Sequence, residues 1–577
     1  MRTQSRRNGC IRVRRVAIAL ALGVAAAVVS PVGAGASTPG RAERPAGRDA
    51  QTSTTPVTQA TANDYTEVVD AVDNEFLPQE LKVEPGTTVM WTNSGRSPHN
   101  VVPAVKSQDF GAPFGVKTAQ FAPGDSYDFT FDVPGTYRYY CTLHGTANTG
   151  MFGSVVVGDG GPAGGETGTA KPTRSGTIRV PADFPTIQAA VDAAKPGAMV
   201  LVAPGTYHEG VTVTPGHENI TIRGESRAGT ILDGQFSDEA GMENGIKILA
   251  DGVAVENMTA QNYAFNGFYW SGVDGYRGSY LTALRNGDYG IYSFDATNGQ
   301  FDHSYGAGSP DAGFYIGQCT KCNALIVDSE SANNGLGYSG TNAGGNLIIA
   351  RSSWHDNRGG IVPNSCTCED DPPQSGVTIV GNVVYSNNNP VAPATGLSEI
   401  AYGEGILLFG GNHGVVTRNR VYDHDVAGIA VSPAPEKLLE PDNANAENFD
   451  ATHNSVIDNV VEDSKYDLFM ASTLDSAAET GDNCFSGNTF TTSVPADIET
   501  LVPCGKPASA SFSADLAAFA AEALAERPAP PDYKTAAWTA PTNLPEMPRA
   551  KTAKARPATH EPSIRIVVKK LSTPPAQ

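Results

Sequence analysis

The chain has 577 residues, with 61 Asp and Glu against 40 Lys and Arg, and its formal net charge at pH 7 is −21. Because domains commonly have about 150 residues, this length predicts more than one domain. An acidic surface repels polyanions, so we expect neither nucleic acid nor an anionic membrane surface as a partner.

The first 36 residues have the pattern of an export signal of the bacterial type. Six arginines lie between positions 2 and 15, an apolar stretch follows from Val16 to Val29, and Ala34-Gly35-Ala36 offers a small-x-small cleavage site. The apolar stretch is shorter than a membrane-spanning helix needs, and no later stretch is apolar enough to span a bilayer. We therefore expect cleavage near Ala36, by the Sec or the twin-arginine route. The mature protein would be secreted or held in the cell envelope, without a membrane span.

Residues 37–65 are rich in Ala, Thr, Pro and Gln without periodicity, which predicts a disordered linker. In residues 66–158, apolar and polar residues alternate over short stretches that are separated by turns such as Pro85-Gly86 and Pro134-Gly135. Alternation with a period of two, broken by such turns, is typical of short strands in a β-sandwich. We expect a small all-β domain here.

This domain contains a set of side chains that suits a metal ion. Cys141, His144 and Met151 lie close together in the sequence, and His99 lies 42 residues before Cys141. One thiolate, two imidazoles and a weak thioether are the ligands of a trigonal type 1 copper site, which passes single electrons with little rearrangement. A lone cysteine in a secreted domain can instead be a packed thiol or half of a disulfide. Because the domain has no second cysteine and no other histidine, we predict one copper ion.

Five segments of the domain form a recognisable pattern: Asp73-Asn74-Glu75-Phe76-x-Pro78, Val83-x-x-Gly86-x-x-Val89-x-Trp91-x-Asn93, His99-Asn100-Val101-Val102, Gly135-x-Tyr137-x-Tyr139-Tyr140-Cys141-x-x-His144 and Met151-x-Gly153-x-Val155. Over residues 66–158 they resemble the plastocyanin-like family of cupredoxins, whose fold is a Greek-key β-sandwich. The resemblance implies that His99, Cys141, His144 and Met151 bind one type 1 copper ion. The interval from His144 to Met151 is longer than the four-residue gap usual in plastocyanin. Asn100 would be a residue that steadies the ligand loop.

The same resemblance implies electron transfer with a redox partner protein. In this family the histidine at the position of His144 is the exposed ligand through which electrons pass. The apolar residues Leu143 and Phe152 beside it would form the docking face for that partner.

Residues 159–176 are rich in Gly, Pro and Thr, which predicts a flexible linker that leaves the copper domain free to move. A repeat begins after residue 177. Glycines recur at intervals of 22 or 23 residues and asparagines mark a second register, at Gly267, Gly290, Gly313 and Gly335 and at Asn257, Asn382, Asn419 and Asn459. This period predicts stacked β coils, and the Leu-x-x-Leu-x-Leu spacing of a leucine-rich horseshoe is absent. Residues 177–504 resemble the right-handed parallel β-helix proteins of the pectate-lyase-like class, with a short helix near 185–194 as a cap.

The second domain contains six cysteines, at Cys319, Cys322, Cys366, Cys368, Cys484 and Cys504. An even number in an exported protein predicts disulfides. The first two pairs could each close locally, bridge neighbouring coils or together bind zinc, although no histidine lies at a matching spacing. The last pair would close the end of the domain.

The β-helix resemblance implies a protein that binds, cleaves or epimerises polysaccharide along one sheet. Alignment of three repeats stacks Trp354, Tyr385 and Tyr422, and beside this column lies a patch made of His355, Asp356, Asp423, His424 and Asp425. Imidazoles beside carboxylates can act as acid and base on a uronate, or hold a metal. The sequence Asp423-His424-Asp425 is similar to the Asp-Pro-His-Asp motif of mannuronan epimerases without its proline. A turn of solvated polar residues would have the same composition.

We expect residues 505–577, which are rich in Ala and Pro, to be mostly disordered. The predicted fold class is all-β: a cupredoxin Greek-key sandwich tethered to a right-handed parallel β-helix. The predicted function is that of an exported copper protein with electron-transfer activity, whose β-helix binds a polysaccharide or protein partner. Two alternatives stay open, namely a carbohydrate-active β-helix enzyme (lyase, hydrolase or epimerase) with an accessory copper domain, and a copper-delivery factor.

Overall fold

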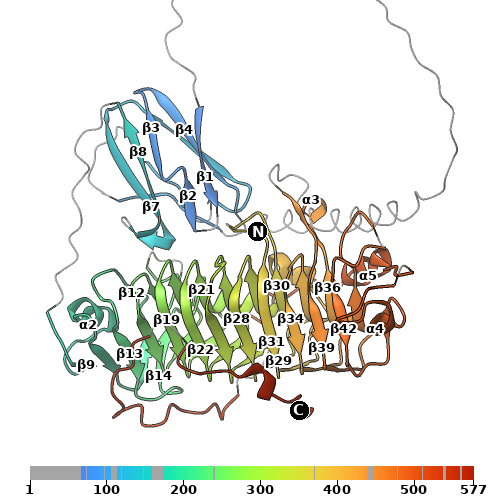
Figure 1. The fold of residues 1–577 in the computed structure, drawn as a ribbon. Helices are drawn as coiled ribbons and strands as arrows, with labels where there is room; N and C mark the ends of the chain where they lie inside the picture. The colour runs from blue at the N-terminus through green and yellow to red at the C-terminus, as the bar shows by residue number, and fades with distance from the viewer. Residues whose placement is uncertain are drawn as a thin grey trace, which may run out of the picture.

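The computed structural model describes residues 66–577, apart from positions 73, 96–97, 105–113, 118–119, 147–148, 159–172, 238–240, 370, 440–445, 477, 510, 537–540 and 559–561. The expected signal peptide, the first linker and most of the second linker lie outside the described residues. Figure 1 shows two bodies, a small β-sandwich and a long solenoid of strands beneath it. The expected all-β architecture is confirmed. Where the chain is described, none of its helices has the length and apolar character needed to cross a membrane.

Among the described residues the sandwich consists of two four-stranded sheets, with the orders β2-β1-β4-β6 and β3-β8-β7-β5. The strands are β1 (Thr66–Val72), β2 (Glu75–Leu77), β3 (Glu80–Val83), β4 (Thr87–Asn93), β5 (Val102–Pro103), β6 (Ser126–Phe131), β7 (Gly135–Thr146) and β8 (Thr149–Val157). Buried and half-buried residues alternate along β4, as expected of a strand with one face on the core. Trp91 of β4 is fully buried, and its ring centroid lies 5.3 Å from that of Tyr139 on β7, so this pair joins the two sheets.

The second body is a parallel β-helix whose described strands form three sheets, of twelve, ten and eleven strands. Sheet 1 consists of β9 (Thr177–Val180), β10 (Met199–Val202), β13 (Thr221–Gly224), β16 (Val253–Glu256), β19 (Asp274–Ser279), β22 (Thr297–Asp302), β25 (Ala324–Val327), β28 (Gly344–Ala350), β31 (Ser375–Val380), β34 (Val415–Thr417), β39 (Ser455–Ile457) and β42 (Cys484–Ser486). Sheet 2 consists of β11 (Gly205–Tyr207), β14 (Thr230–Asp233), β17 (Thr259–Gln261), β20 (Thr282–Leu284), β23 (Tyr305–Ala307), β26 (Glu330–Ala332), β29 (Ser353–His355), β32 (Val383–Tyr385), β35 (Arg420–Tyr422) and β40 (Val460–Glu462). Sheet 3 consists of β12 (Val211–Val213), β15 (Ile246–Ile248), β18 (Phe268–Ser271), β21 (Tyr289–Phe294), β24 (Ala312–Gly317), β27 (Leu336–Thr341), β30 (Gly359–Asn364), β33 (Glu404–Phe409), β36 (Ala427–Ser432), β41 (Tyr466–Met470) and β43 (Ser493–Val494).

Asparagine side chains stack at the corner between sheets 1 and 2. Asn382 Nδ2 donates to Asn419 Oδ1 at 3.0 Å, and Asn419 Nδ2 donates to Asn459 Oδ1 at 3.0 Å. Three residues of the predicted asparagine register, Asn382, Asn419 and Asn459, therefore form a buried hydrogen-bonded ladder. At Asn419 and Asn459 the left-handed backbone conformation belongs to the residue before the asparagine, Arg418 (φ 53°) and Asp458 (φ 56°), whereas Asn257 is itself left-handed (φ 55°).

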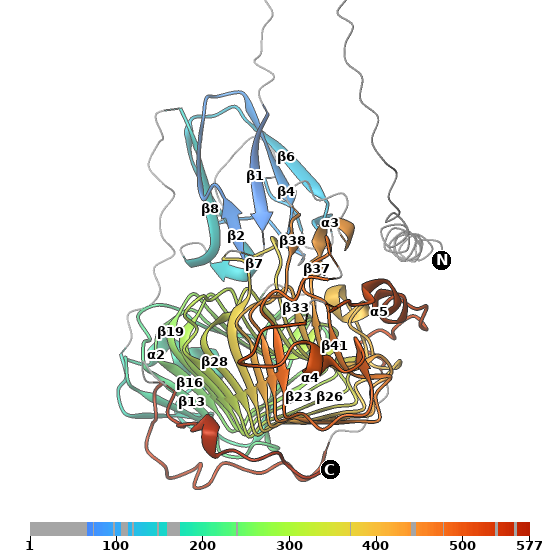
Figure 2. The same ribbon diagram turned by 45° about the vertical axis from the view of Figure 1, so that its right-hand side comes forward.

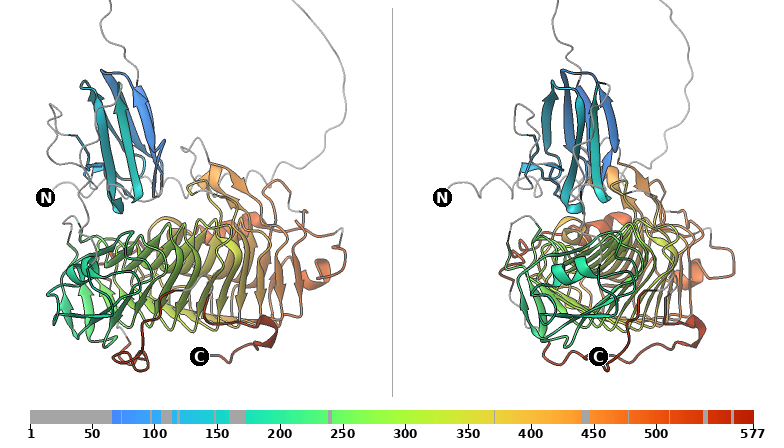
Figure 3. Two further views of the ribbon diagram at one scale, coloured as in Figure 1. Left: turned by 60° about the vertical axis from the view of Figure 1, so that its left-hand side comes forward. Right: turned by 90° about the vertical axis from the view of Figure 1, so that its left-hand side faces the viewer.

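The ends of the solenoid are closed as its open edges require. Helix α2 (Ile187–Ala193) lies at the first coil, and the Thr186 side chain accepts a hydrogen bond from the Ala189 backbone N–H. The right-hand view of Figure 3 looks toward this end. The far end carries α4 (Ile498–Leu501) and α5 (Leu516–Ala523), and the remaining short elements are α3 (Glu436–Leu439), η2 (Gly396–Glu399), η3 (Val568–Lys570), β37 (Ala434–Pro435) and β38 (Asn448–Phe449).

The six cysteines of the β-helix form three disulfides, Cys319–Cys322, Cys366–Cys368 and Cys484–Cys504. The two close pairs are therefore local disulfides, which do not bridge coils or bind zinc.

The tail after residue 504 differs from the expected disorder. From residue 541 on, its described residues run along the β-helix on the side opposite the sandwich (Figures 1 and 2). Proline prevents regular helices and strands in the tail. The backbone carbonyl groups of the tail nevertheless accept hydrogen bonds from the β-helix. The buried Arg223 guanidinium donates to the carbonyls of Ala553 (2.7 Å) and Lys554 (3.0 Å). Apolar tail residues such as Ile566 and Leu571 also cover outward-facing residues of sheet 1. Burial of this apolar surface explains the ordered path.

Candidate metal centre

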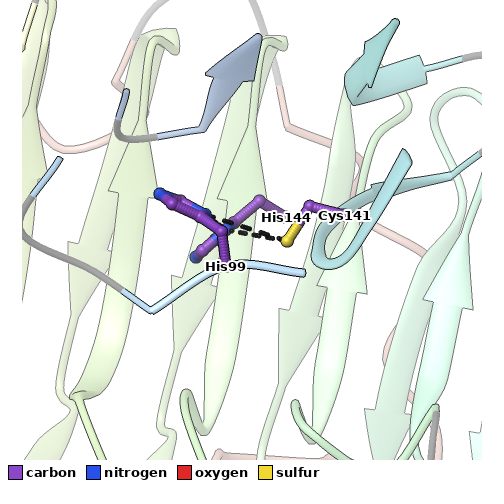
Figure 4. A group of neighbouring side chains, drawn as sticks. All are labelled: His99, Cys141 and His144. Carbon is purple, nitrogen blue, oxygen red and sulfur yellow. Dashed lines mark hydrogen bonds between the residues drawn. The ribbon is translucent and has the colours of Figure 1, made fainter. Parts of the chain in front are cut away.

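Three potential ligands meet at the end of the sandwich that faces the β-helix. His99 lies shortly before β5, and Cys141 and His144 lie on β7, which pairs with β5 through Val102 and Tyr140. His99 Nδ1 lies 3.0 Å from His144 Nδ1, and Cys141 Sγ lies 3.5 Å from His144 Nδ1 and 3.8 Å from His99 Nδ1. Figure 4 shows the two imidazoles and the sulfur turned toward one another.

These three atoms have the spacing of ligands around one metal ion. Bonds of about 2.0 Å to nitrogen and about 2.3 Å to sulfur hold ligand atoms about 3 to 4 Å apart around a single centre. His99 and Cys141 are fully buried, and the ligand atoms of the group lie within 4.8 Å of one another. Cys141 is the one free cysteine among the described residues, so no disulfide occupies its sulfur. A thiolate with two imidazoles fits copper of type 1.

Asn100 contacts the ligand loop as a supporting residue would. Its Oδ1 accepts a hydrogen bond from the Thr142 backbone N–H, and its Nδ2 donates to the Thr142 hydroxyl, both at 2.9 Å. Two bonds to the residue that follows Cys141 restrict the backbone on which the sulfur is carried.

Met151 lies in the same buried core as Cys141 and is fully buried. Its backbone packs closely on Gly145: a Cβ atom at Gly145 would lie 2.4 Å from the Met151 nitrogen. The two strands can therefore approach only because residue 145 is glycine. The axial role of the Met151 sulfur stays a prediction.

The histidine that we expected to be exposed is covered. His144 is 2% exposed, and Leu143 is 1% exposed, because the β-helix packs against this end of the sandwich. The Phe265 ring stands edge-on to the His144 imidazole, with 6.3 Å between ring centroids. Burial above all, and then the charges of His99 and Lys247, hold the pKa of His144 well below its usual value. The imidazole is thus neutral, as a metal ligand must be.

Charged side chains of the β-helix reach the ligand loop. Lys247 Nζ, on β15, donates to the carbonyl oxygens of Thr142 at 3.1 Å and Gly145 at 3.0 Å. The Thr142 hydroxyl donates to Glu243 Oε1 at 3.0 Å. Burial lowers the pKa of Lys247, and the charges of Glu243 and Cys141 oppose this effect.

Neutral groups complete the contact between the domains. Asn244 Nδ2 donates to the carbonyl of Leu143 at 3.0 Å. The Asn74 amide, between β1 and β2, accepts from the Tyr269 hydroxyl at 2.9 Å and donates to the Tyr292 hydroxyl at 3.3 Å. The expectation of a freely moving copper domain is therefore wrong for this structure. The sequence carries no signal for the contact, because single polar residues on the outward face of a solenoid are ordinary.

The structure does not bring the residues of the predicted patch on the β-helix into one cluster. His424 is 2% exposed and occupies a rung of a polar ladder, where its Nε2 lies 3.2 Å from Asn387 Nδ2. Burial lowers the pKa of His424 to about 3. Its neighbours Asp423 and Asp425 are exposed, so the imidazole and the two carboxylates are on opposite sides of the backbone.

The other two patch residues form an ion pair. His355 Nδ1 lies 2.8 Å from Asp356 Oδ2, and its Nε2 lies 3.3 Å from Glu330 Oε1. Burial lowers the pKa of His355, but the two carboxylates outweigh burial and raise it to about 9. The strand register also differs from the predicted alignment by one residue at Trp354. Trp354 pairs with Val384 and His355 pairs with Tyr385, and Tyr385 in turn pairs with Tyr422 in the next coil. Trp354 therefore belongs to the core, while the stacked column consists of His355, Tyr385 and Tyr422.

Known proteins resemble the two domains separately. Residues 64–158 match the family model for copper binding proteins of the plastocyanin/azurin family, and residues 266–434 match the model for a right handed beta helix region. Chloroplastic plastocyanin of Hordeum vulgare is 36% identical over 89 residues, which are 14% of this chain and 54% of that sequence. Plastocyanin of Vicia faba is 35% identical over 91 residues, which are 14% of this chain and 86% of that protein. The chain thus spans about half the length of the first relative and most of the second.

Among solved structures, a reduced amicyanin variant covers 17% of this chain and 87% of its own, at 33% identity and a TM-score of 0.14. The A-module of the mannuronan C-5 epimerase AlgE4 from Azotobacter vinelandii covers 56% of this chain and 93% of its own, at 13% identity and a TM-score of 0.38. The family model, the Vicia faba relative and the buried His-Cys-His group agree on the sandwich. Through residues 64–158, the chain belongs to the plastocyanin/azurin family of copper binding proteins, and a right-handed β-helix follows this domain.

Proposed function

We propose that the protein is an exported electron-transfer protein that holds one type 1 copper ion between His99, Cys141 and His144, with Met151 as the axial ligand. The observation that carries the proposal is the buried group of one thiol and two imidazoles, whose ligand atoms lie within 4.8 Å of one another. Copper bound there would supply one-electron chemistry between Cu(I) and Cu(II).

The residues around the group suit that chemistry. His99 and His144 come from segments that are fixed by β-pairing, and Asn100 holds the loop between Cys141 and His144 through two hydrogen bonds. A site that is already assembled needs little movement when its charge changes, which favours fast electron transfer. Burial keeps water from the ligands. The partner would be a redox protein that donates or accepts one electron.

Export is part of the proposal and rests on the arginine-rich and apolar pattern of residues 1–36. For the β-helix we propose attachment to a polysaccharide or a protein. The stacked rings of His355, Tyr385 and Tyr422, whose centroids lie 4.7 and 5.2 Å apart, give it a half-exposed aromatic column of the kind that sugars contact. Because His424 is buried away from Asp423 and Asp425, no described contact favours polysaccharide catalysis by that patch.

A redox titration tests the proposal. The full chain is titrated with Cu(II), then reduced and reoxidised in a spectroelectrochemical cell. We expect one tightly bound copper per chain and a reversible one-electron couple, and His99→Gln should lose both. As a control, His208→Gln changes an exposed histidine of the β-helix and should keep both. Failure of the wild-type chain to bind copper, or a bound copper that does not cycle, would overturn the proposal.

A further inference from the structure

The β-helix sets two opposite charges against the ligand loop of the other domain. The Lys247 ammonium donates to the carbonyls of Thr142 and Gly145, which lie on either side of the segment that ends in His144. The Glu243 carboxylate accepts from the Thr142 hydroxyl at 3.0 Å. Lys247 is 6% exposed and Glu243 is 8% exposed, so solvent ions screen neither charge strongly.

Such charges act differently on the two oxidation states of a nearby ion. Coulomb energy is proportional to the charge of the ion, so a fixed cation destabilises Cu(II) more than Cu(I), and a fixed anion stabilises Cu(II) more. Lys247 should therefore raise the reduction potential of the centre, and Glu243 should lower it. Both side chains belong to residues 243–247, a segment that no pattern of the copper-binding family includes.

We propose that Glu243 and Lys247 of the β-helix are tuning residues that set the reduction potential of the copper centre in the sandwich, in opposite directions. This inference rests on the proposed copper function. It gives the β-helix a role within the redox chemistry, as a built-in docking partner whose charges act on the centre while the two domains are in contact.

The interface contains neutral contacts that should keep the domains together when one charge is removed. Asn244 bonds the Leu143 carbonyl, and Tyr269 and Tyr292 bond the Asn74 amide. Single substitutions at positions 243 and 247 therefore test charge, while Asn244→Ala tests docking without a change in charge.

The experiment measures the Cu(II)/Cu(I) ratio of the full chain while the solution potential is held at the midpoint potential of the wild type. Lys247→Met and Lys247→Gln should each raise this ratio about tenfold, which corresponds to a midpoint about 59 mV lower for a one-electron couple. Glu243→Gln, which keeps an acceptor for Thr142, should lower the ratio by a similar factor. The charge controls Lys195→Met and Glu479→Gln, at exposed positions near the two ends of the β-helix, should leave it unchanged.

The outcomes separate the inference from the function on which it rests. A higher ratio in the Lys247 variants together with a lower ratio in Glu243→Gln supports the inference, and the reverse pair of shifts would overturn it. Shifts in the same direction, matched by Asn244→Ala, would mean that only docking matters and would overturn it, as would the absence of any shift. A wild-type chain without a reversible copper couple would instead overturn the proposed function.

Discussion

The Tyr269 hydroxyl of the β-helix donates a hydrogen bond of 2.9 Å to Asn74 Oδ1 of the sandwich, across 195 residues of sequence. Asn74 also bonds the Tyr292 hydroxyl, and both tyrosines are buried in the contact. This single amide thus links the copper domain to two neighbouring coils of sheet 3. Its position explains why the end of the sandwich that holds His144 is closed.

Removal of that amide should loosen the docked state. Asn74 has φ 69°, so Asn74→Gly deletes the side chain without straining the backbone. Two buried hydroxyls would lose this partner, at a cost of about 1–3 kcal/mol. We expect a Cu(I) chelator to remove copper about 5- to 150-fold faster than from the wild type. Ser94→Ala, an exposed change on the same domain, serves as the control, and equal rates for the two variants would contradict the prediction.

Gly145 should be indispensable to the ligand loop. In Gly145→Ala the new Cβ would meet the Met151 nitrogen at 2.4 Å and the Met151 carbonyl oxygen at 2.7 Å, so the strands must move apart. Overpacking of this kind costs about 1–3 kcal/mol. The urea midpoint of the copper absorption band should fall accordingly. Gly135→Ala, whose Cβ would have its nearest neighbour at 3.6 Å, is the matched control, and a midpoint shared by both variants would rule out the close approach.

Glu404 should make the β-helix less stable as the pH rises. The side chain is buried, with no hydrogen-bond partner for either carboxylate oxygen among the described residues, and burial raises its pKa well above the usual value. The folded chain keeps this proton at pH values where the unfolded chain has lost it. Stability therefore declines above the unfolded pKa of about 4.3, until the folded pKa is reached.

Glu404→Gln removes this linkage. The variant should unfold at a higher urea concentration than the wild type at pH 7, by at least about 1 kcal/mol in free energy, and should differ less at pH 4. Glu479→Gln, at an exposed position, should show no such pH-dependent gain. A variant that is less stable than the wild type at pH 7 would indicate that Glu404 is ionised and paired.

His355 should also make the folded chain less stable as the pH rises, but over a higher pH range than Glu404. Its folded pKa of about 9, set by Asp356 and Glu330 against the effect of burial, lies above the unfolded value of about 6.5. The stabilisation is fully present below pH 6.5 and is lost as the pH rises through 9. Because Asp356 and Glu330 are partly exposed, we expect a contribution of only about 1 kcal/mol.

The measurement compares urea midpoints of the wild type and His355→Gln at pH 6 and pH 10. The two should differ at pH 6 and converge at pH 10, while His208→Gln should follow the wild type throughout. A difference that persists at pH 10 would show that packing on Tyr385, and not the ion pair, is responsible.

Local patterns in the sequence were sufficient to predict the two folds and the group of metal ligands. The alternation in β4 depends on neighbouring residues, and Cys141 and His144 are three positions apart on one strand. The asparagine ladder follows from one residue repeated in successive coils, at Asn382, Asn419 and Asn459. Each of these features is specified within a strand or a repeat, where periodicity is a direct physical signal.

Features that depend on contacts between distant surfaces could not be predicted in this way. Lys247 and Glu243 are unremarkable as polar residues of a solenoid, and only docking brings them to Thr142. The tail was expected to be disordered because composition does not record that the Arg223 guanidinium, beyond its pair with Glu256, donates to tail carbonyls. His424 was misread because an imidazole replaces asparagine in a ladder rung, which a count of polar residues does not distinguish from a surface group.

The central claim is that a copper ion is bound through the Cys141 sulfur. The most direct test is the visible absorption and EPR spectrum of the full chain loaded with one equivalent of Cu(II). We predict an intense thiolate-to-copper band and the narrow hyperfine splitting of a type 1 site, both abolished in Cys141→Ser. A loaded chain that is colourless, or whose spectrum is unchanged in Cys141→Ser, would contradict the account.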